Sequence, residues 1–195
     1  MKIAVIGAGL FGITIAHKLA KKHRVDIYEK EDNILTAASG INQFRLHRGY
    51  HYPRSLETVH SSMESLNSFR KEFQKAIIRN ISHYYCIAKK GSLTTPKQYV
   101  DFCRRNELEF KQTDLDLINK NKIDLCLKVN ENLIDPEKLK SLLLKKLEHP
   151  NLKQFLGRAA TKEALGSYNK VIICTYANIN SLLEKRQGRN CANRI

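Results

Sequence analysis

Residues 1–30 have the sequence MKIAVIGAGLFGITIAHKLAKKHRVDIYEK, and this stretch decides the fold. The apolar run at positions 3–6 predicts a strand buried in a parallel sheet. Gly7, Gly9 and Gly12 follow it in the pattern GxGxxG. In this pattern the first glycine allows a tight turn, the second admits a pyrophosphate, and the third lets the following helix pack closely on the strand. The stretch therefore predicts a dinucleotide-binding βαβ unit.

The second predicted strand, residues 25–28, ends at an acidic residue. Glu29 lies 22 positions after Gly7, close to the roughly 20 expected for an acid that accepts hydrogen bonds from ribose hydroxyls. The alternative is an ordinary βαβ corner, but the strand before the glycines, the helix after them and the acid at the expected distance all agree with the dinucleotide-binding prediction. The turn residues Leu10 and Phe11, and Lys30 beside the acid, complete the first group of predicted cofactor-binding residues.

Composition indicates a globular chain of one domain or two small ones. The 195 residues are 42% hydrophobic and 27% charged, values typical of soluble proteins. No apolar run approaches the roughly 20 residues of a membrane span, and the first residues lack a signal-peptide pattern. Five cysteines without CxxC spacing fit a reducing compartment. We therefore expect a cytoplasmic protein without a membrane partner.

The formal net charge of +15 raises the possibility of a nucleic-acid partner. The lysines, however, are spread along the chain and form no stripe with aromatic residues. A basic surface of this kind promotes non-specific association and says little about activity. We therefore predict no specific nucleic-acid partner.

Residues 33–54, NILTAASGINQFRLHRGYHYPR, form a long polar and aromatic segment where a plain nicotinamide-binding domain would soon continue to another helix and strand. Loops of this length are usually functional or disordered, and the aromatic content argues against disorder. Its hydrogen-bonding side chains include Ser39, Asn42, Arg45, His47, Arg48, Tyr50, His51 and Tyr52. His47 and His51 are four residues apart, but no further ligand cluster stands nearby, so we predict no metal site.

At these residues the sequence resembles the FAD-dependent oxidoreductases of the D-amino-acid oxidase type. The resemblance rests on VIGAGLFGITIAHKLA with Glu29, on AASGINQFRLHRGYHYPRS, and on two weaker later matches. It implies FAD as cofactor. In that family the second segment contacts the diphosphate, the ribityl chain and the isoalloxazine, which makes Ser39, Asn42, Arg45 and His47 candidate flavin contacts. The chain departs from the family at Cys174-Thr175-Tyr176-Ala177, where an Ala-Thr-Gly-like turn is usual.

The later chain shows helix and strand patterns. Ser55 is expected to cap an amphipathic helix of about twenty residues, and Asp135-Pro136 to start another. Strands are predicted at 83–88, 125–129 and 170–174, and a short helix at 96–105. We predict an FAD-binding domain from 1–80 and 134–183, a partial substrate or cap region at 81–133, and a frayed tail at 184–195.

Together these patterns predict an α/β fold, a Rossmann-like three-layer FAD-binding domain with a partial inserted α+β substrate region. The implied function is FAD-dependent oxidation of a small amine, amino-acid or hydroxyl substrate. One alternative is an NAD-binding Rossmann enzyme, and another is a non-catalytic basic binding module or remnant. Because the family generally has longer chains, we expect an incomplete chain with weak FAD binding, or a second chain that completes the site. The catalytic base, substrate and electron acceptor do not follow from the sequence.

Overall fold

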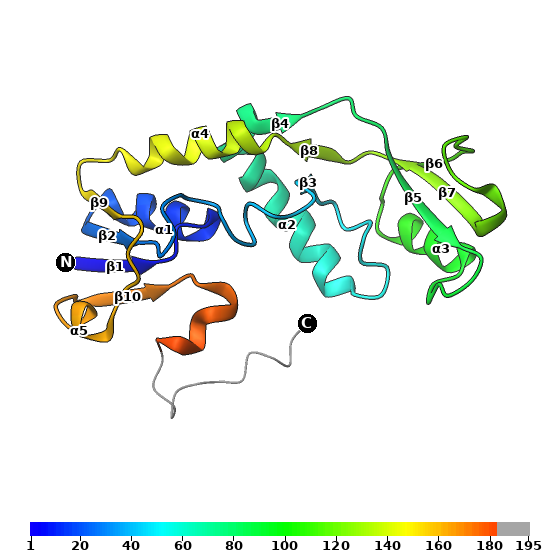
Figure 1. Ribbon diagram of the computed structural model, residues 1–195. Coiled ribbons are helices and arrows are strands. Elements are labelled where there is room, and N and C mark those ends of the chain that lie inside the picture. Colours follow the sequence, from blue (N-terminus) through cyan, green and yellow to red (C-terminus); the bar gives the residue numbers. More distant parts are fainter. Residues whose placement is uncertain (183–195) are drawn as a thin grey trace. The chain divides into compact units, whose positions relative to one another are not determined.

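The computed structural model describes residues 1–182 (Figure 1). The chain divides into two units, each with its own internal contacts. Unit 1 contains residues 1–43 and, within the described part, 140–182, and unit 2 contains residues 44–139. The domain limits given above concern the functional role of each part and stay a prediction. The predicted tail at 184–195 lies outside the described residues.

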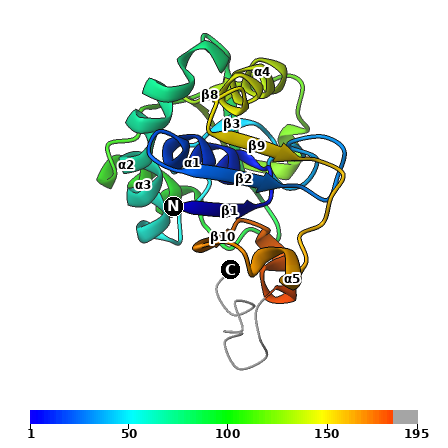
Figure 2. The same cartoon turned by 90° about the vertical axis from the view of Figure 1, so that its left-hand side faces the viewer.

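Unit 1 is built on a four-stranded parallel sheet (Figures 1 and 2). Its strands are β1 (Lys2–Ile6), β2 (Arg24–Tyr28), β9 (Leu152–Phe155) and β10 (Lys170–Ile173). They lie side by side in the order β9-β2-β1-β10. Counted along the chain this is 3-2-1-4, the beginning of the strand order of doubly wound dinucleotide-binding sheets. The predicted fold class is therefore confirmed.

Helix α1 (Leu10–Ala20) connects β1 to β2. Its buried positions, Gly12, Ile13, Ala16 and Ala20, recur at helical spacing and pack on the sheet. A short helix α5 (Lys162–Leu165) lies between β9 and β10, and a 3₁₀ turn η3 (Tyr176–Ser181) follows β10. The sequence did not predict β9, because its four residues, LKQF, carry too little apolar pattern to mark a strand.

Unit 2 contains two antiparallel sheets and two longer helices. One sheet is β3 (Arg45–Leu46), β8 (Asn132–Ile134) and β4 (Ile77–Ile78), and the other is β5 (His83–Ala88), β7 (Ile123–Val129) and β6 (Phe110–Gln112), each in this spatial order. The helical elements are α2 (Leu56–Phe73), η1 (Gln74–Ala76), α3 (Pro96–Arg105) and η2 (Lys120–Lys122). Helix α4 (Pro136–Leu147) begins in unit 2 and continues into unit 1.

The core of unit 2 combines aromatic and aliphatic side chains. Tyr50, Val59, Tyr99, Phe102 and Leu127 are all buried in it. The two buried tyrosines also satisfy their hydroxyl groups: Tyr50 donates to the Glu109 carbonyl at 2.6 Å, and Tyr99 donates to the Tyr50 carbonyl at 2.8 Å. These bonds remove the cost of burying a phenol.

Helix starts show which capping predictions hold. Asp135 Oδ1 accepts hydrogen bonds from the backbone N–H groups of Glu137 and Lys138, at 3.1 and 3.0 Å, so the predicted cap is present. Ser55 does stand at the first position before α2, but its hydroxyl pairs with the Thr58 hydroxyl at 2.7 Å and caps no backbone N–H. Within residues 1–182, no helix is both long enough and apolar enough to cross a membrane.

Candidate functional site

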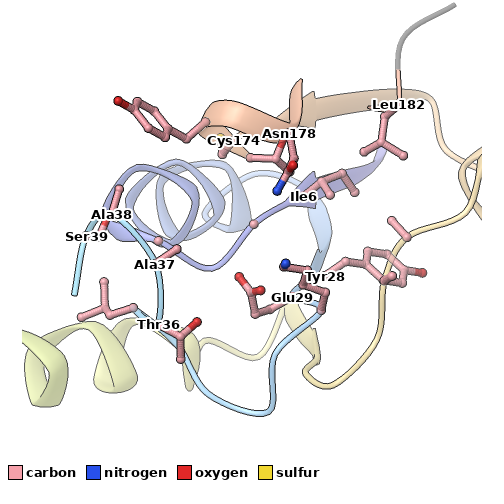
Figure 3. A pocket seen from close by; sticks show the side chains of 18 of the residues that line it. Ile6, Tyr28, Glu29, Thr36, Ala37, Ala38, Ser39, Cys174, Asn178 and Leu182 are labelled. Carbon is pink, nitrogen blue, oxygen red and sulfur yellow. The ribbon is translucent and has the colours of Figure 1, made fainter. Parts of the chain in front are cut away.

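The carboxyl ends of β1 and β10 are neighbours at the point where the strand order reverses. Ligands of open α/β sheets bind at such a switch point. A pocket of about 400 Å³ lies there, entirely within unit 1 (Figure 3). Its lining includes Gly7 and Gly9 after β1, Glu29 and Lys30 after β2, the loop residues Thr36, Ala38 and Ser39, Arg158 and Ala160 after β9, and Cys174 and Thr175 after β10.

Two of the three motif glycines are required by the backbone itself. Gly7 has φ +103°, and a Cβ on it would lie 2.6 Å from the Cys174 carbonyl oxygen. A Cβ on Gly12 would collide with the Gly7 carbonyl oxygen. The first glycine therefore makes the turn beside β10, and the third allows α1 to pack on β1, as the motif predicts.

Gly9 and Ser39 form the wall of the pocket at the start of α1. Gly9 is the residue before the helix, and a Cβ on it would lie 3.1 Å from Ser39 Oγ. The same Oγ accepts a hydrogen bond from the Leu10 N–H at 3.2 Å. Asn42 does not line the pocket, but its side-chain amide donates to the carbonyls of Ala38 and Ser39, at 3.1 and 3.2 Å. Asn42 thus braces the loop that carries Ser39.

Glu29 ties the ends of β1 and β2 together at the pocket (Figure 3). Its Oε2 accepts a hydrogen bond from the Ala8 N–H at 2.8 Å, and its Oε1 accepts one from the Glu31 N–H at 3.2 Å. Lys30 points its ammonium toward the Glu31 carboxylate, 3.3 Å away, on the exposed side. The Glu29 carboxylate is therefore held in position and keeps further lone pairs for ligand hydroxyls.

Beyond Glu29 the pocket meets a group of flat side chains. The Tyr28 ring stacks on the Phe155 ring with 4.7 Å between centroids, and the Arg158 guanidinium lies 5.6 Å from the Phe155 centroid. The backbone N–H of Arg158 donates to the backbone carbonyl of Glu29 at 2.8 Å. The Tyr28 hydroxyl is paired with the hydroxyl of Tyr168 at 2.8 Å. Packed aromatic and guanidinium planes of this kind suit a heteroaromatic ring.

The turn after β10 carries an unsatisfied hydroxyl. Thr175 Oγ1 is buried, lines the pocket, and has no hydrogen-bond partner among the described residues. Such a group costs free energy unless a ligand or water pairs with it. Next to it Tyr176 is exposed and has φ +49°, a left-handed conformation that disfavours bulky residues. Burial raises the pKa of the Cys174 thiol, so this cysteine stays protonated near neutral pH.

Of the predicted cofactor-binding residues, Gly7, Gly9, Glu29, Lys30 and Ser39 line this one pocket. Leu10, Phe11, Gly12 and Asn42 belong to the same unit but do not line it. Arg45 and His47 belong to unit 2. The sequence did not single out Arg158 or Ala160, because β9, which positions them, was not predicted.

Arg45 and His47 take part in a polar group around the buried Glu131 that we call the Glu131 cluster, formed by Arg45, His47, Tyr85 and Glu131. The Arg45 guanidinium donates to the Tyr85 hydroxyl at 2.9 Å, and that hydroxyl donates to Glu131 Oε2 at 2.9 Å. The backbone N–H of Arg48 donates to Glu131 Oε1 at 3.2 Å. Glu131 is 1% exposed, so its carboxyl oxygens depend on these hydrogen bonds in place of water.

Two imidazoles lie beside this carboxylate without conventional hydrogen bonds. His47 Nδ1 is 3.8 Å from Glu131 Oε1, and both His47 Nδ1 and His83 Nε2 are buried without a hydrogen-bond partner among the described residues. Burial lowers the pKa of each histidine, and Glu131 partly opposes that shift. Burial, reinforced by Glu131, raises the pKa of the Tyr85 hydroxyl. Both imidazoles are therefore held mainly in the neutral form.

Sequence reasoning missed Glu131, Tyr85 and His83. They belong to no local motif, and strand pairing between distant segments brings them together. Within residues 1–182, no group of three or more His, Cys, Asp or Glu side chains could hold a metal ion.

The sheet order, the glycine turn, the acid after β2 and the pocket at the switch point define a dinucleotide-binding fold. The family model for FAD dependent oxidoreductases, DAO, matches residues 2–189. The chain therefore belongs to this family, as the resemblance implied, and the cofactor of the family is FAD. The pocket fits such a group: it offers a glycine turn, a positioned carboxylate and an unpaired buried hydroxyl.

Known proteins resemble the chain over part of their length. It is 31% identical over 102 residues to the FAD-dependent monooxygenase kojA of Aspergillus flavus. The aligned stretch covers 52% of this chain and 24% of that protein. Glycine oxidase from Geobacillus kaustophilus has a similar fold, with a TM-score of 0.69 at 13% identity, over 92% of this chain and 57% of that one. The L-alpha-glycerophosphate oxidase of Mycoplasma pneumoniae, solved with FAD bound, has a TM-score of 0.60 at 15% identity. The match covers 83% of this chain and 46% of that one. The chain thus spans about a quarter of the first relative and just over half of the second.

Proposed function

We propose that unit 1 binds FAD in the switch-point pocket, and that the chain is the cofactor-binding part of a flavoenzyme that oxidises a small amine, amino-acid or hydroxyl substrate. The observation that carries this proposal is the Thr175 hydroxyl. It is buried in the pocket of a dinucleotide-binding fold and lacks a partner among the described residues. A bound cofactor supplies the missing hydrogen bond and removes the cost of leaving the group unpaired.

Each wall of the pocket has a proposed role. The first N–H groups of α1, reached past Gly9, hold the diphosphate, because a helix N-terminus carries unpaired donors and a partial positive charge. Glu29 accepts hydrogen bonds from the ribose hydroxyls, and Lys30 supplies a positive charge at the same rim. The Ser39 hydroxyl lies beside the same helix start and contacts the phosphate or the adjoining chain.

Arg45 and His47 remain proposed contacts of the redox-active end of FAD, which would supply hydride-accepting chemistry there when bound. The structure holds the Arg45 guanidinium through Tyr85 and leaves the His47 imidazole mainly neutral. A fixed cation can orient an anionic substrate or the flavin, and a neutral imidazole can accept a proton. Asn42 acts indirectly in this proposal, by fixing the loop that carries Ser39.

A second chain, or a longer form of this one, is proposed to complete the ring-binding part of the site. Two observations support it: the chain spans 57% of the structurally similar glycine oxidase, and Val171 on the outer strand β10 is 38% exposed. Among the described residues β10 pairs only with β1. We therefore expect residues 1–195 alone to bind FAD weakly and to turn over little or no substrate.

The test is the visible absorption spectrum of the purified chain, followed by titration of the apoprotein with FAD. Bound flavin has a visible spectrum that NAD lacks, so a colourless protein that binds NAD and not FAD contradicts the proposal. Gly9→Val places a side chain against Ser39 at the start of α1 and is expected to abolish binding while the fold remains. Gly166→Ala is the matched control in unit 1, because a Cβ there meets its nearest neighbour, the Glu163 carbonyl oxygen, at an ordinary 3.5 Å.

A further inference from the structure

Two cysteines face each other across the larger sheet of unit 2. Cys86 on β5 pairs in register with Cys126 on the antiparallel strand β7. Both are free thiols. The two residues are forty positions apart in the chain, so no sequence spacing marked them as a pair.

The backbone hydrogen bonds show which kind of cross-strand pair this is. The carbonyl oxygen of Cys126 accepts a hydrogen bond from the Thr113 N–H at 3.0 Å, beside β6. The N–H and C=O of one strand residue point toward the same neighbour, so Cys126 exchanges no backbone hydrogen bonds with Cys86 on the other side. Non-hydrogen-bonded pairs have Cα atoms about 4.5 Å apart and side chains close together. That separation falls within the range of about 4.4 to 6.8 Å that a disulfide spans.

The two thiols lie on the sheet face opposite to the core of unit 2. Side chains alternate along a strand, and Ile87, Leu125 and Leu127 on the other face are part of that core. Cys86 is exposed, whereas Cys126, on the central strand, is buried. Burial, together with the neighbouring Cys86 thiol, raises the pKa of Cys126 to about 11. Cys86 is therefore the accessible nucleophile, and Cys126 is the thiol that attacks second.

We propose that Cys86 and Cys126 are a redox modification site that forms a reversible intramolecular disulfide, with a low-molecular-weight disulfide such as oxidised glutathione as oxidant. The Cys86 thiolate attacks one sulfur of the oxidant, forms a mixed disulfide and releases one thiol. Cys126 then loses its proton, attacks the Cys86 sulfur and releases the second thiol. Two protein thiols are oxidised, one disulfide is reduced to two thiols, and the two protons pass to the leaving sulfurs.

The bond joins β5 to β7 one residue away from Tyr85, whose hydroxyl holds Arg45 and Glu131 on the opposite face. It closes a loop that contains α3, β6 and η2. Because a cross-link restricts the unfolded chain, the oxidised form is expected to unfold at a higher temperature than the reduced form. Because the bond forms by reversible exchange with a glutathione disulfide, it is expected to be reduced by excess dithiothreitol.

The experiment treats the folded full chain with oxidised glutathione, blocks the remaining thiols with N-ethylmaleimide, and digests the protein with trypsin. The expected product is one cross-linked pair of peptides, residues 80–89 with residues 123–128, which dithiothreitol separates. Intact protein is expected to lose about 2 Da before blocking, with no glutathione retained. Cys174, half-buried in unit 1, should still react with maleimide once the protein is denatured, and serves as the internal control.

Cys86→Ser is the decisive variant, because it changes an exposed position and leaves the buried cysteine in place. It should form no cross-link and show no oxidant-dependent rise in melting temperature. The proposal is overturned by glutathione that stays on Cys86, by a cross-link through any other cysteine, or by full retention of both thiols. It is also overturned if Cys86→Ser responds to the oxidant as the parent chain does.

Discussion

The pocket of unit 1 and the Glu131 cluster of unit 2 solve the same problem, the placement of polar groups in a protein interior, in different ways. In the pocket the polar groups come from strand ends and a helix start, so the backbone determines where they point. In the Glu131 cluster four side chains come from three separate segments: Arg45, Tyr85 and Glu131 are linked by hydrogen bonds, and His47 lies beside the carboxylate without one. The folding of the pocket region is therefore expected to depend mainly on its backbone, and that of the cluster on its side chains.

The largest effect is expected at Glu131. Glu131→Ala leaves the Tyr85 hydroxyl and the backbone N–H of Arg48 without their buried acceptor. It also removes the carboxylate to which the Tyr85 hydroxyl links the Arg45 guanidinium. Breaking such a buried network by removing one partner costs about 3–5 kcal/mol of unfolding free energy. Urea unfolding of the full chain, monitored by circular dichroism, measures this loss of unfolding free energy. Glu64→Ala, an exposed carboxylate on α2, is the control and should change stability by less than about 0.5 kcal/mol.

A loss equal to that of the control would mean that the cluster contributes no more than surface charges do, and the contrast between the two regions would fail. Glu131→Gln sharpens the measurement. It keeps one acceptor oxygen for the Tyr85 hydroxyl but removes the negative charge near Arg45, so an intermediate loss separates the hydrogen bonds from the charge.

The second effect concerns binding at the pocket. Glu29→Ala removes a proposed acceptor of ribose hydroxyls, so FAD affinity should fall by about 1.5–3 kcal/mol, roughly ten- to a hundredfold. The Ala8 N–H loses its partner as well, so stability must be measured beside affinity. Fluorescence titration with FAD gives the affinity. Glu31→Ala, an exposed carboxylate two residues along, should leave it nearly unchanged, and equal losses in the two variants would contradict the role of Glu29.

Most of the pocket could be predicted from the sequence because its determinants are local. Gly7, Gly12 and Glu29 have their roles within one βαβ unit, and the motif spacing encodes those roles. Strand β9, which lies beside β2 in the sheet, was not predicted, because it is a short edge strand with two polar residues. Arg158, which β9 positions, was missed with it.

The Glu131 cluster could not be predicted, because nothing within VNENLID distinguishes a buried acid from a surface one. Its burial depends on pairing of β3 with β8 and of β5 with β7, contacts between segments more than thirty residues apart. The cysteine pair has the same origin. The alternation of apolar residues at 125, 127 and 129 indicates a strand with one exposed face, whereas Cys126 on that face is buried because β7 is the centre of its sheet.

The third and smaller effect is a pH dependence of the stability of unit 2. Burial lowers the pKa of His83 and His47 below the ordinary 6.5; at His47, Glu131 opposes the shift, and His51 and Arg45 add to it. The unfolded chain therefore takes up protons at a higher pH than the folded one. The stability due to the neutral imidazoles is present above about pH 6.5 and is lost as the pH falls through the folded-state pKa values. Urea midpoints between about pH 8 and 5 should decline on the acid side. The decline should be shallower in His83→Gln, and an unchanged slope would rule out His83 as a contributor.

The smallest effect is expected at Tyr176, in the turn after β10. Its φ of +49° places a bulky side chain in the left-handed region, which costs about 1–2 kcal/mol. Tyr176→Gly removes that cost. The greater conformational freedom of glycine in the unfolded chain, however, lowers the stability by about 0.5–1 kcal/mol. The exposed ring gives up little packing, since it is 76% exposed. The two opposing effects leave a net gain of about 0–1.5 kcal/mol for the variant.

Asn80→Gly separates the strain of Tyr176 from a general effect of glycine. Asn80 also has a positive φ, +61°, and is exposed, but asparagine tolerates this conformation far better than tyrosine does. The glycine variant at position 80 should therefore gain nothing or lose slightly, while the one at position 176 gains. Thermal unfolding of the two variants beside the parent chain measures the difference. Equal shifts would show that the turn after β10 carries no special strain, and that the backbone of the pocket is as relaxed there as in an ordinary surface turn.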